Sequence, residues 1–69
     1  MKYAVIKVTN GNFNIHAEGF VDNVNGAKIS YHDLCKALWN DAGTQTACAM
    51  IVDENLDVLP GYKEFISKV

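Results

Sequence analysis

Apolar and polar positions alternate along the start of this chain and later change to a helical spacing, which divides it into distinct segments. Residues 1–9 are rich in residues that favour strands, which predicts a β-strand. Because successive strand residues point to opposite sides, Ala4, Ile6 and Val8 should share one face. The other face should carry Tyr3, Val5 and Lys7.

A hairpin is predicted next. Asn10 and Gly11 both tolerate positive φ, so they favour a tight turn between two strands. Residues 13–21 alternate again and predict a second strand with one polar face in water. The apolar face of this strand is expected to carry Phe13, Ile15, Ala17, Gly19 and Val21.

The stretch 30–42 shows helical spacing and is predicted to be the one long helix. Ser30 is suited to cap its start, since its hydroxyl can accept a hydrogen bond from a first-turn amide. Gly43 is suited to a left-handed cap at its end. Residues 22–28 are interpreted as a polar loop, and Ile29 as a hydrophobic staple residue before the cap. The apolar stripe would consist of Tyr31, Leu34, Cys35, Leu38 and Ala42.

The rest of the chain predicts two further elements. Residues 44–53 are apolar at positions on both faces, which places this third strand inside the sheet. Residues 57–59 predict a short fourth strand, broken by Pro60 and Gly61. Residues 62–69 have apolar positions at helical spacing, so either a short helix or a last strand follows.

These elements predict an α+β fold of ββαββ order. A right-handed crossover from the second strand to the third would pass over the first, giving an antiparallel sheet of order 2-1-3-4. The helix 30–42 would cover one face, forming a small two-layer sandwich. A β-grasp arrangement has the same element order and is the alternative. Neither arrangement indicates a function by itself.

Composition bounds the class of protein. A chain of 69 residues makes one domain, 1–69, with a thin core, and such domains often gain stability from oligomerisation. The net charge of −2 disfavours nucleic-acid binding, because phosphate contacts need a basic surface. No apolar run is long enough to span a membrane or to act as a signal peptide. Two cysteines do not make a disulfide framework, so we expect a cytoplasmic setting in which Cys35 and Cys48 stay reduced.

One pair of residues suggests catalysis. His32 and Cys35 lie three apart on the predicted helix and would be neighbours, so the histidine could activate a thiolate nucleophile. Cys35 also falls in the middle of the apolar stripe, where a small buried side chain belongs. We therefore expect packing rather than a thiol enzyme, and no catalytic residues.

Two candidate metal sites are also disfavoured. His16, His32, Cys35 and Cys48 are zinc-ligand types, but they lack the close pairs on tight turns that structural zinc sites use. Asp53, Asn55, Asp57 and Glu64 have the ligand spacing of a calcium-binding EF-hand loop. However, Val58 stands where that loop needs glycine, and a hairpin turn explains the same residues. We expect no metal and no cofactor.

The function favoured by these features is non-enzymatic protein–protein interaction, with a second copy or with another protein. A sheet has two edges, and the second strand is the expected edge for β-addition by a partner. Trp39, Phe20 and Tyr31 are the candidate interface residues, since aromatic residues are enriched in interface cores. The alternative for Trp39 is packing over the sheet margin of its own chain. A nucleic-acid-binding accessory protein with these aromatics and Phe13 as a stacking platform is the less favoured alternative function.

Overall fold

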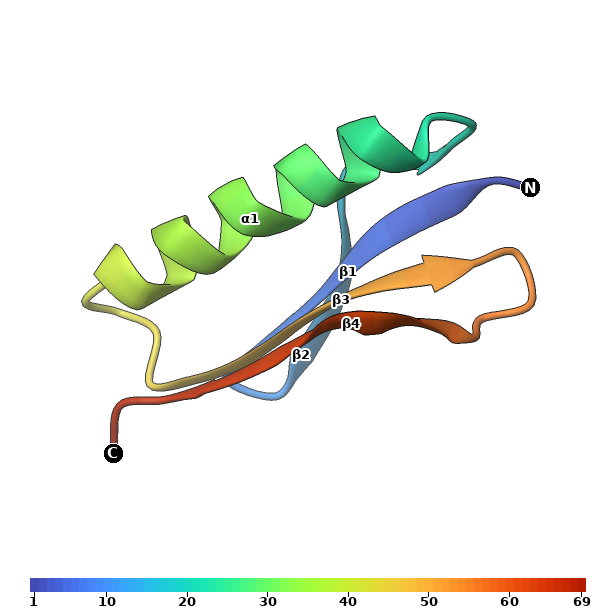
Figure 1. Ribbon diagram of the computed structural model, residues 1–69. Coiled ribbons are helices and arrows are strands. Elements are labelled where there is room, and N and C mark those ends of the chain that lie inside the picture. Colours follow the sequence, from blue (N-terminus) through green and yellow to red (C-terminus); the bar gives the residue numbers. More distant parts are fainter.

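The computed structural model describes residues 1–69, with the side chains of all but residues 17 and 18. Four strands and one helix follow each other in the order β1 (Tyr3–Thr9), β2 (Asn12–Val21), α1 (Val24–Asn40), β3 (Thr46–Asp53) and β4 (Val58–Ser67). The strands form one sheet of order β2-β1-β3-β4, in which all neighbours are antiparallel. The helix lies along one face of this sheet (Figure 1). The predicted α+β class, with an antiparallel sheet and one long helix, is confirmed.

The helix begins at Val24 and not at residue 30, so the predicted start was wrong. Asn23 is the cap: its backbone is extended, and its Oδ1 accepts a hydrogen bond of 3.1 Å from the backbone amide of Gly26. Ala27 is buried and extends the apolar stripe by one turn towards the N-terminus. Ser30 is a residue of the helix interior, and Ile29 is exposed on the helix instead of acting as a staple.

The predicted end of the helix at residue 42 also needs correction. The helix ends at Asn40, followed by Asp41 in an extended conformation, and Ala42 is exposed beyond it. Gly43 is not in the left-handed region. The last carbonyls are satisfied differently, because Lys68 Nζ donates to the carbonyl oxygens of Leu38 and Asp41. A cation at this end is favourable, since the helix dipole makes the C-terminus negative.

The C-terminal segment is strand β4, not a helix. Ile66 is fully buried and contacts the core under α1, whereas its neighbour Phe65 is exposed. Apolar residues on both sides of one strand produced the apparent helical spacing. The predicted break is an irregularity inside this longer strand, with Gly61 at φ 85°.

Strand β2 does not keep the predicted single apolar face. The register with β1 joins Val5 to His16 but Tyr3 to Val21, so β2 carries extra residues between these two pairs. Gly19 lies in this irregular part with φ 82°, a conformation that suits glycine. The extra residues shift the alternation, and Val21 therefore packs against the core under the helix.

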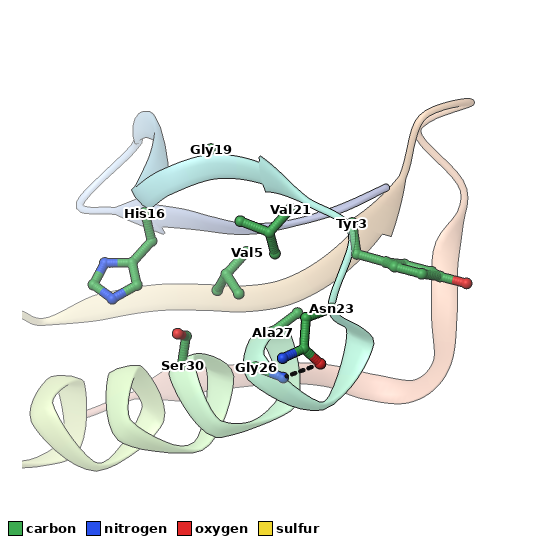
Figure 2. Close-up of a pocket in the computed structure, with 9 residues that line it drawn as sticks. All are labelled: Tyr3, Val5, His16, Gly19, Val21, Asn23, Gly26, Ala27 and Ser30. Atoms are coloured by element: carbon green, nitrogen blue, oxygen red, sulfur yellow. Dashed lines mark hydrogen bonds between the residues drawn. The ribbon is translucent and has the colours of Figure 1, made fainter. Parts of the chain in front are cut away.

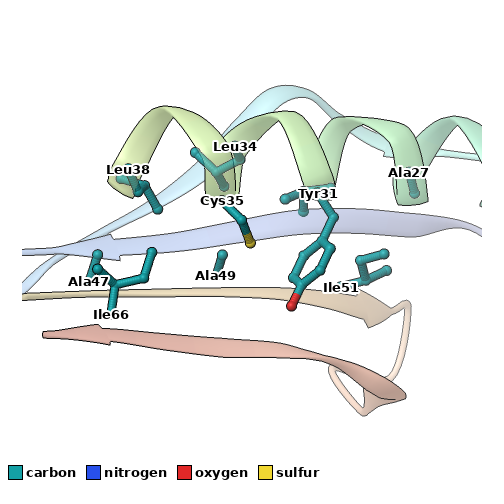
Figure 3. Packing of buried hydrophobic residues seen from close by; sticks show 10 residues of the cluster. Ala27, Tyr31, Leu34, Cys35, Leu38, Ala47, Ala49, Ile51 and Ile66 are labelled. Carbon is teal, nitrogen blue, oxygen red and sulfur yellow. The ribbon is translucent and has the colours of Figure 1, made fainter. Parts of the chain in front are cut away.

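The main core lies between α1 and the sheet, where side chains from the helix point at β3 and β4 (Figure 3). Its buried members are Val5, Ala27, Tyr31, Leu34, Cys35, Leu38, Ala47, Ala49, Ile51 and Ile66. A second, smaller cluster of Ala4, Ile6 and Val52 lies apart from it. The two clusters confirm the predicted alternation of β1, with Val5 in one and Ala4 and Ile6 in the other.

Candidate functional site

The face of the sheet opposite the helix carries a continuous apolar row. The strand register aligns Phe13 with Val8, Val8 with Cys48, and Cys48 with Phe65, so the row crosses all four strands. The two phenylalanines at its ends are 66% and 67% exposed. We call these four residues the apolar row, and the side of the sheet that carries them the open face.

The open face continues beyond the apolar row. The next register positions are Ile15, Ile6 and Met50, and the second core cluster lies beyond them. Ile15 is 47% exposed. Among the elements that the structure describes, the helix covers the other side of the sheet and none lies over the open face (Figure 1). Of the described side chains on this face, Ala4, Ile6 and Val52 are buried, whereas Phe13, Ile15 and Phe65 are exposed.

Both sheet edges are irregular. Strand β2 is an edge strand, as expected, but its pairing with β1 is regular only from Asn12 to His16. The β3–β4 pairing shifts between Met50 and Val52, close to Gly61. Bulges of this kind shorten the regular edge that an added strand could pair with. The geometry therefore favours contact through the open face over β-addition at the second strand.

The three residues predicted for an interface do not form one surface. Tyr31 is 5% exposed and belongs to the core, where its ring meets the ring of Tyr62 edge to face at 5.6 Å. Trp39 is 51% exposed at the end of α1, and its Nε1 donates to Glu64 Oε2 on β4 at 2.7 Å. Phe20 is 38% exposed at the end of β2. Phe20 precedes the start of α1 by a few residues, whereas Trp39 is near its last residue, so the two lie near opposite ends of the helix.

A second candidate is a cavity of about 330 Å³ between β2 and the first half of α1. His16 points from β2 towards the helix, and the Ser30 hydroxyl points from α1 towards the sheet (Figure 2). The whole lining consists of Tyr3, Val5, His16, Gly19, Val21, Asn23, Gly26, Ala27 and Ser30. Apolar and hydrogen-bonding groups thus meet in one small space.

The structure gives no support to the thiol pair. Cys35 is 8% exposed, and burial raises the pKa of its thiol. The hydrogen bond with Tyr31 acts in the opposite direction but is the smaller effect. His32 is exposed, with its ring centroid 5.3 Å from that of Tyr31. A protonated, buried thiol is a poor nucleophile.

The acidic stretch after β3 is a hairpin turn. Asp53 Oδ1 accepts hydrogen bonds from the backbone amides of Asn55 and Asp57, and the Leu56 amide donates to the carbonyl oxygen of Asp53. This is the turn that the Asp and Asn content suggested. Among the side chains that the structure describes, no three of His, Cys, Asp or Glu lie close enough together to hold a metal ion.

Sequence reasoning did not identify either candidate. In the sequence, the alternation of β1 and the apolar residues Phe13 and Ile15 indicate this face, but the same pattern is typical of a face that is buried in a core. The cavity depends on the irregular part of β2, for which Gly19 was the only visible signal.

Comparison with protein-family models, with curated proteins and with solved structures gives no match to this chain. None of the helices among the described residues is long and apolar enough to cross a membrane. The open face and the cavity are therefore the features of this chain that indicate a function.

Proposed function

We propose that this protein is a non-enzymatic interaction module that forms a homodimer through the open face of its sheet. The observation that carries the proposal is the apolar row, with Phe13 and Phe65 two-thirds exposed at its ends. Large side chains in water at both edges of an uncovered apolar sheet favour burial against another surface, because removing apolar area from water is stabilising.

The size of the face is compatible with a dimer. Four strands about 4.8 Å apart, with about seven residues each at a rise of ~3.3 Å, cover roughly 19 by 23 Å. That is about 440 Å² as a flat area on each copy, before the relief of the side chains is counted. Two copies would bury about 900 Å² or more, which is near the lower limit for a specific interface. An interface of this size is typical of a weak or transient dimer, whose affinity depends on how well Phe13 and Phe65 pack rather than on area.

A second copy is the partner that suits this face. A two-fold contact needs only a patch that complements itself, and one apolar face stacked on another meets that condition. The register places Lys63 beside Met50 at the margin of the open face, in the outer strand β4. Ala4, Ile6 and Val52 are already buried, so the area that stacking removes from water comes mainly from Phe13, Ile15 and Phe65. With Lys63 at the margin, this contact would not trap an unpaired charge, which would be costly.

The test compares three proteins by sedimentation equilibrium. The wild-type chain should dimerise, whereas a Phe13→Thr/Phe65→Thr double variant should remain monomeric at the same concentrations. Threonine favours strands, and both positions are exposed, so the fold should persist in circular dichroism. The control is Ile29→Thr, which removes an equally exposed apolar side chain (65%) from the helix and should leave the dimer unchanged.

Either of two results would contradict the proposal. If the wild-type chain stays monomeric at millimolar concentration, the open face does not mediate self-association. A dimer that survives in the double variant must use another surface. If Trp39→Ala abolishes that dimer instead, Trp39 is the contact residue, as the sequence predicts.

A further inference from the structure

The cavity beside β2 lies on the helix side of the sheet and plays no part in the dimer proposed above. Its volume of about 330 Å³ is within the range of small-molecule sites. It exists because of the extra residues in β2. Between the pairs Val5–His16 and Tyr3–Val21, the strand departs from regular pairing and leaves space beside the helix.

The floor of the cavity is apolar. Val5 and Ala27 are almost completely buried, and Val21 is half-buried beside them (Figure 2). These side chains already belong to the core or pack against it, so the floor is held in place by the fold. An apolar floor of this kind accepts the hydrocarbon part of a ligand.

Three polar groups surround this floor. His16 and Ser30 approach it from opposite sides, as Figure 2 shows. Asn23 uses its Oδ1 to cap the helix, which leaves the two hydrogens of its Nδ2 as donors. The Asn23 amide lies directly over Gly26, where a Cβ would come within 3.3 Å of Nδ2. Glycine at this position thus permits the amide to sit at the rim.

The polar groups of the lining favour an acceptor-rich ligand. Serine hydroxyl, asparagine amide and imidazole N–H are all hydrogen-bond donors. Of the nine lining residues, none is Asp or Glu, so a carboxylate ligand would meet no like charge among them. A basic ligand, by contrast, would find no anionic partner among these nine residues.

We propose that this cavity binds a small organic acid with an apolar body. Its carboxylate accepts hydrogen bonds from Ser30 Oγ and Asn23 Nδ2, His16 closes the opposite side, and the apolar body lies on Val5 and Val21. Hydrogen bonds to a charged group are stronger than neutral ones, so the carboxylate sets the chemical class of ligand.

The test is an NMR titration of the ¹⁵N-labelled full chain with benzoate, and with benzamide as its neutral isostere. Benzoate should cause saturable shift changes centred on Gly19, Asn23 and Gly26, and benzamide should bind about tenfold more weakly. Ser30→Ala should weaken benzoate binding by about tenfold as well. The adjacent control Ile29→Ala, which is exposed on the helix, should bind as the wild type does.

A cavity-filling variant gives an independent readout. Val21→Phe places a larger side chain in the space and should abolish the benzoate shifts while the circular dichroism spectrum is retained. The proposal is overturned if benzoate shifts do not saturate, if benzamide binds equally well, or if Ser30→Ala has no effect. The titration is repeated on the Phe13→Thr/Phe65→Thr variant, so that loss of the dimer and loss of ligand binding are measured separately.

Discussion

Asn23 and Ser30 are expected to affect the stability of the fold in opposite ways when each is replaced by alanine. Asn23→Ala removes the side chain whose Oδ1 accepts a 3.1 Å hydrogen bond from the Gly26 amide. Loss of such a cap costs about 1 kcal/mol, within a range of roughly 0.5–2 kcal/mol. For a domain of this length, about 1 kcal/mol lowers the melting temperature by roughly 4–8 °C.

Ser30→Ala should not have this cost. Ser30 lies inside α1, where alanine has the higher helix propensity by up to about 0.5 kcal/mol. We therefore expect its melting temperature to be unchanged or slightly raised. A helix that started at residue 30 would give the reverse result, because Ser30 would then be the cap.

The assay is thermal and urea unfolding followed by circular dichroism, with amide hydrogen exchange at Ala27. The Ala27 amide donates to the carbonyl oxygen of Asn23 at 3.0 Å, and its protection should fall in Asn23→Ala. Asn25→Ala is the matched control, since it removes an exposed asparagine from the first turn without removing the cap. A loss of about 1 kcal/mol in Ser30→Ala with none in Asn23→Ala would refute the reasoning.

Three further predictions concern the turn after β1, the core and the end of the helix. Asn10→Gly keeps the positive φ of 49° but removes side-chain bonds to Gln45, Thr46 and Gly43, so urea unfolding should show a loss of about 1–2 kcal/mol. Burial raises the pKa of Tyr31 to about 12, so stability that is present below its unfolded pKa of about 10 is lost as the pH rises towards 12. Tyr31→Phe should remove this part of the alkaline dependence of the urea midpoint. The Gly43 amide and then the Thr44 hydroxyl lower the pKa of Asp41, so its contribution is present above the unfolded pKa and lost as the pH falls through the folded pKa. Asp41→Asn should flatten the acid side of the same profile; unchanged profiles in these variants would contradict the two assignments.

Local patterns predicted the strands of the sheet centre and the first turn well. The alternation of β1 separates Val5 from Ile6 as expected, and β3 is internal, as its two apolar faces indicated. Asn10 and Gly11 both have positive φ in the hairpin turn. In each case a local sequence pattern determines the structure, and no second pattern in the same residues favours a different one.

The helix boundaries failed because two residues carried the same local signal. Asn23 and Ser30 are both good caps, and the intervening Gly26 favoured a loop. The deciding contact is tertiary: Ala27 packs against the sheet, and its burial extends the helix by a further turn. Helix propensity is a weak effect, so it does not fix such a boundary when packing favours a longer helix.

The candidate sites depend on which face of the sheet is covered by another element. The alternation of apolar residues along a strand does not show this. Phe13 and Ile15 look like core residues in the sequence, because a strand pattern shows that a face is apolar but not that another element covers it. With one helix for two faces, one apolar side of the sheet must stay open. The cavity is related to the irregular part of β2, since the extra residues around Gly19 move Val21 to the helix side, where it lines the space between β2 and α1. Both sites therefore follow from the balance between the apolar surface of the sheet and the single helix available to cover it, and a partner or a ligand would supply the missing cover.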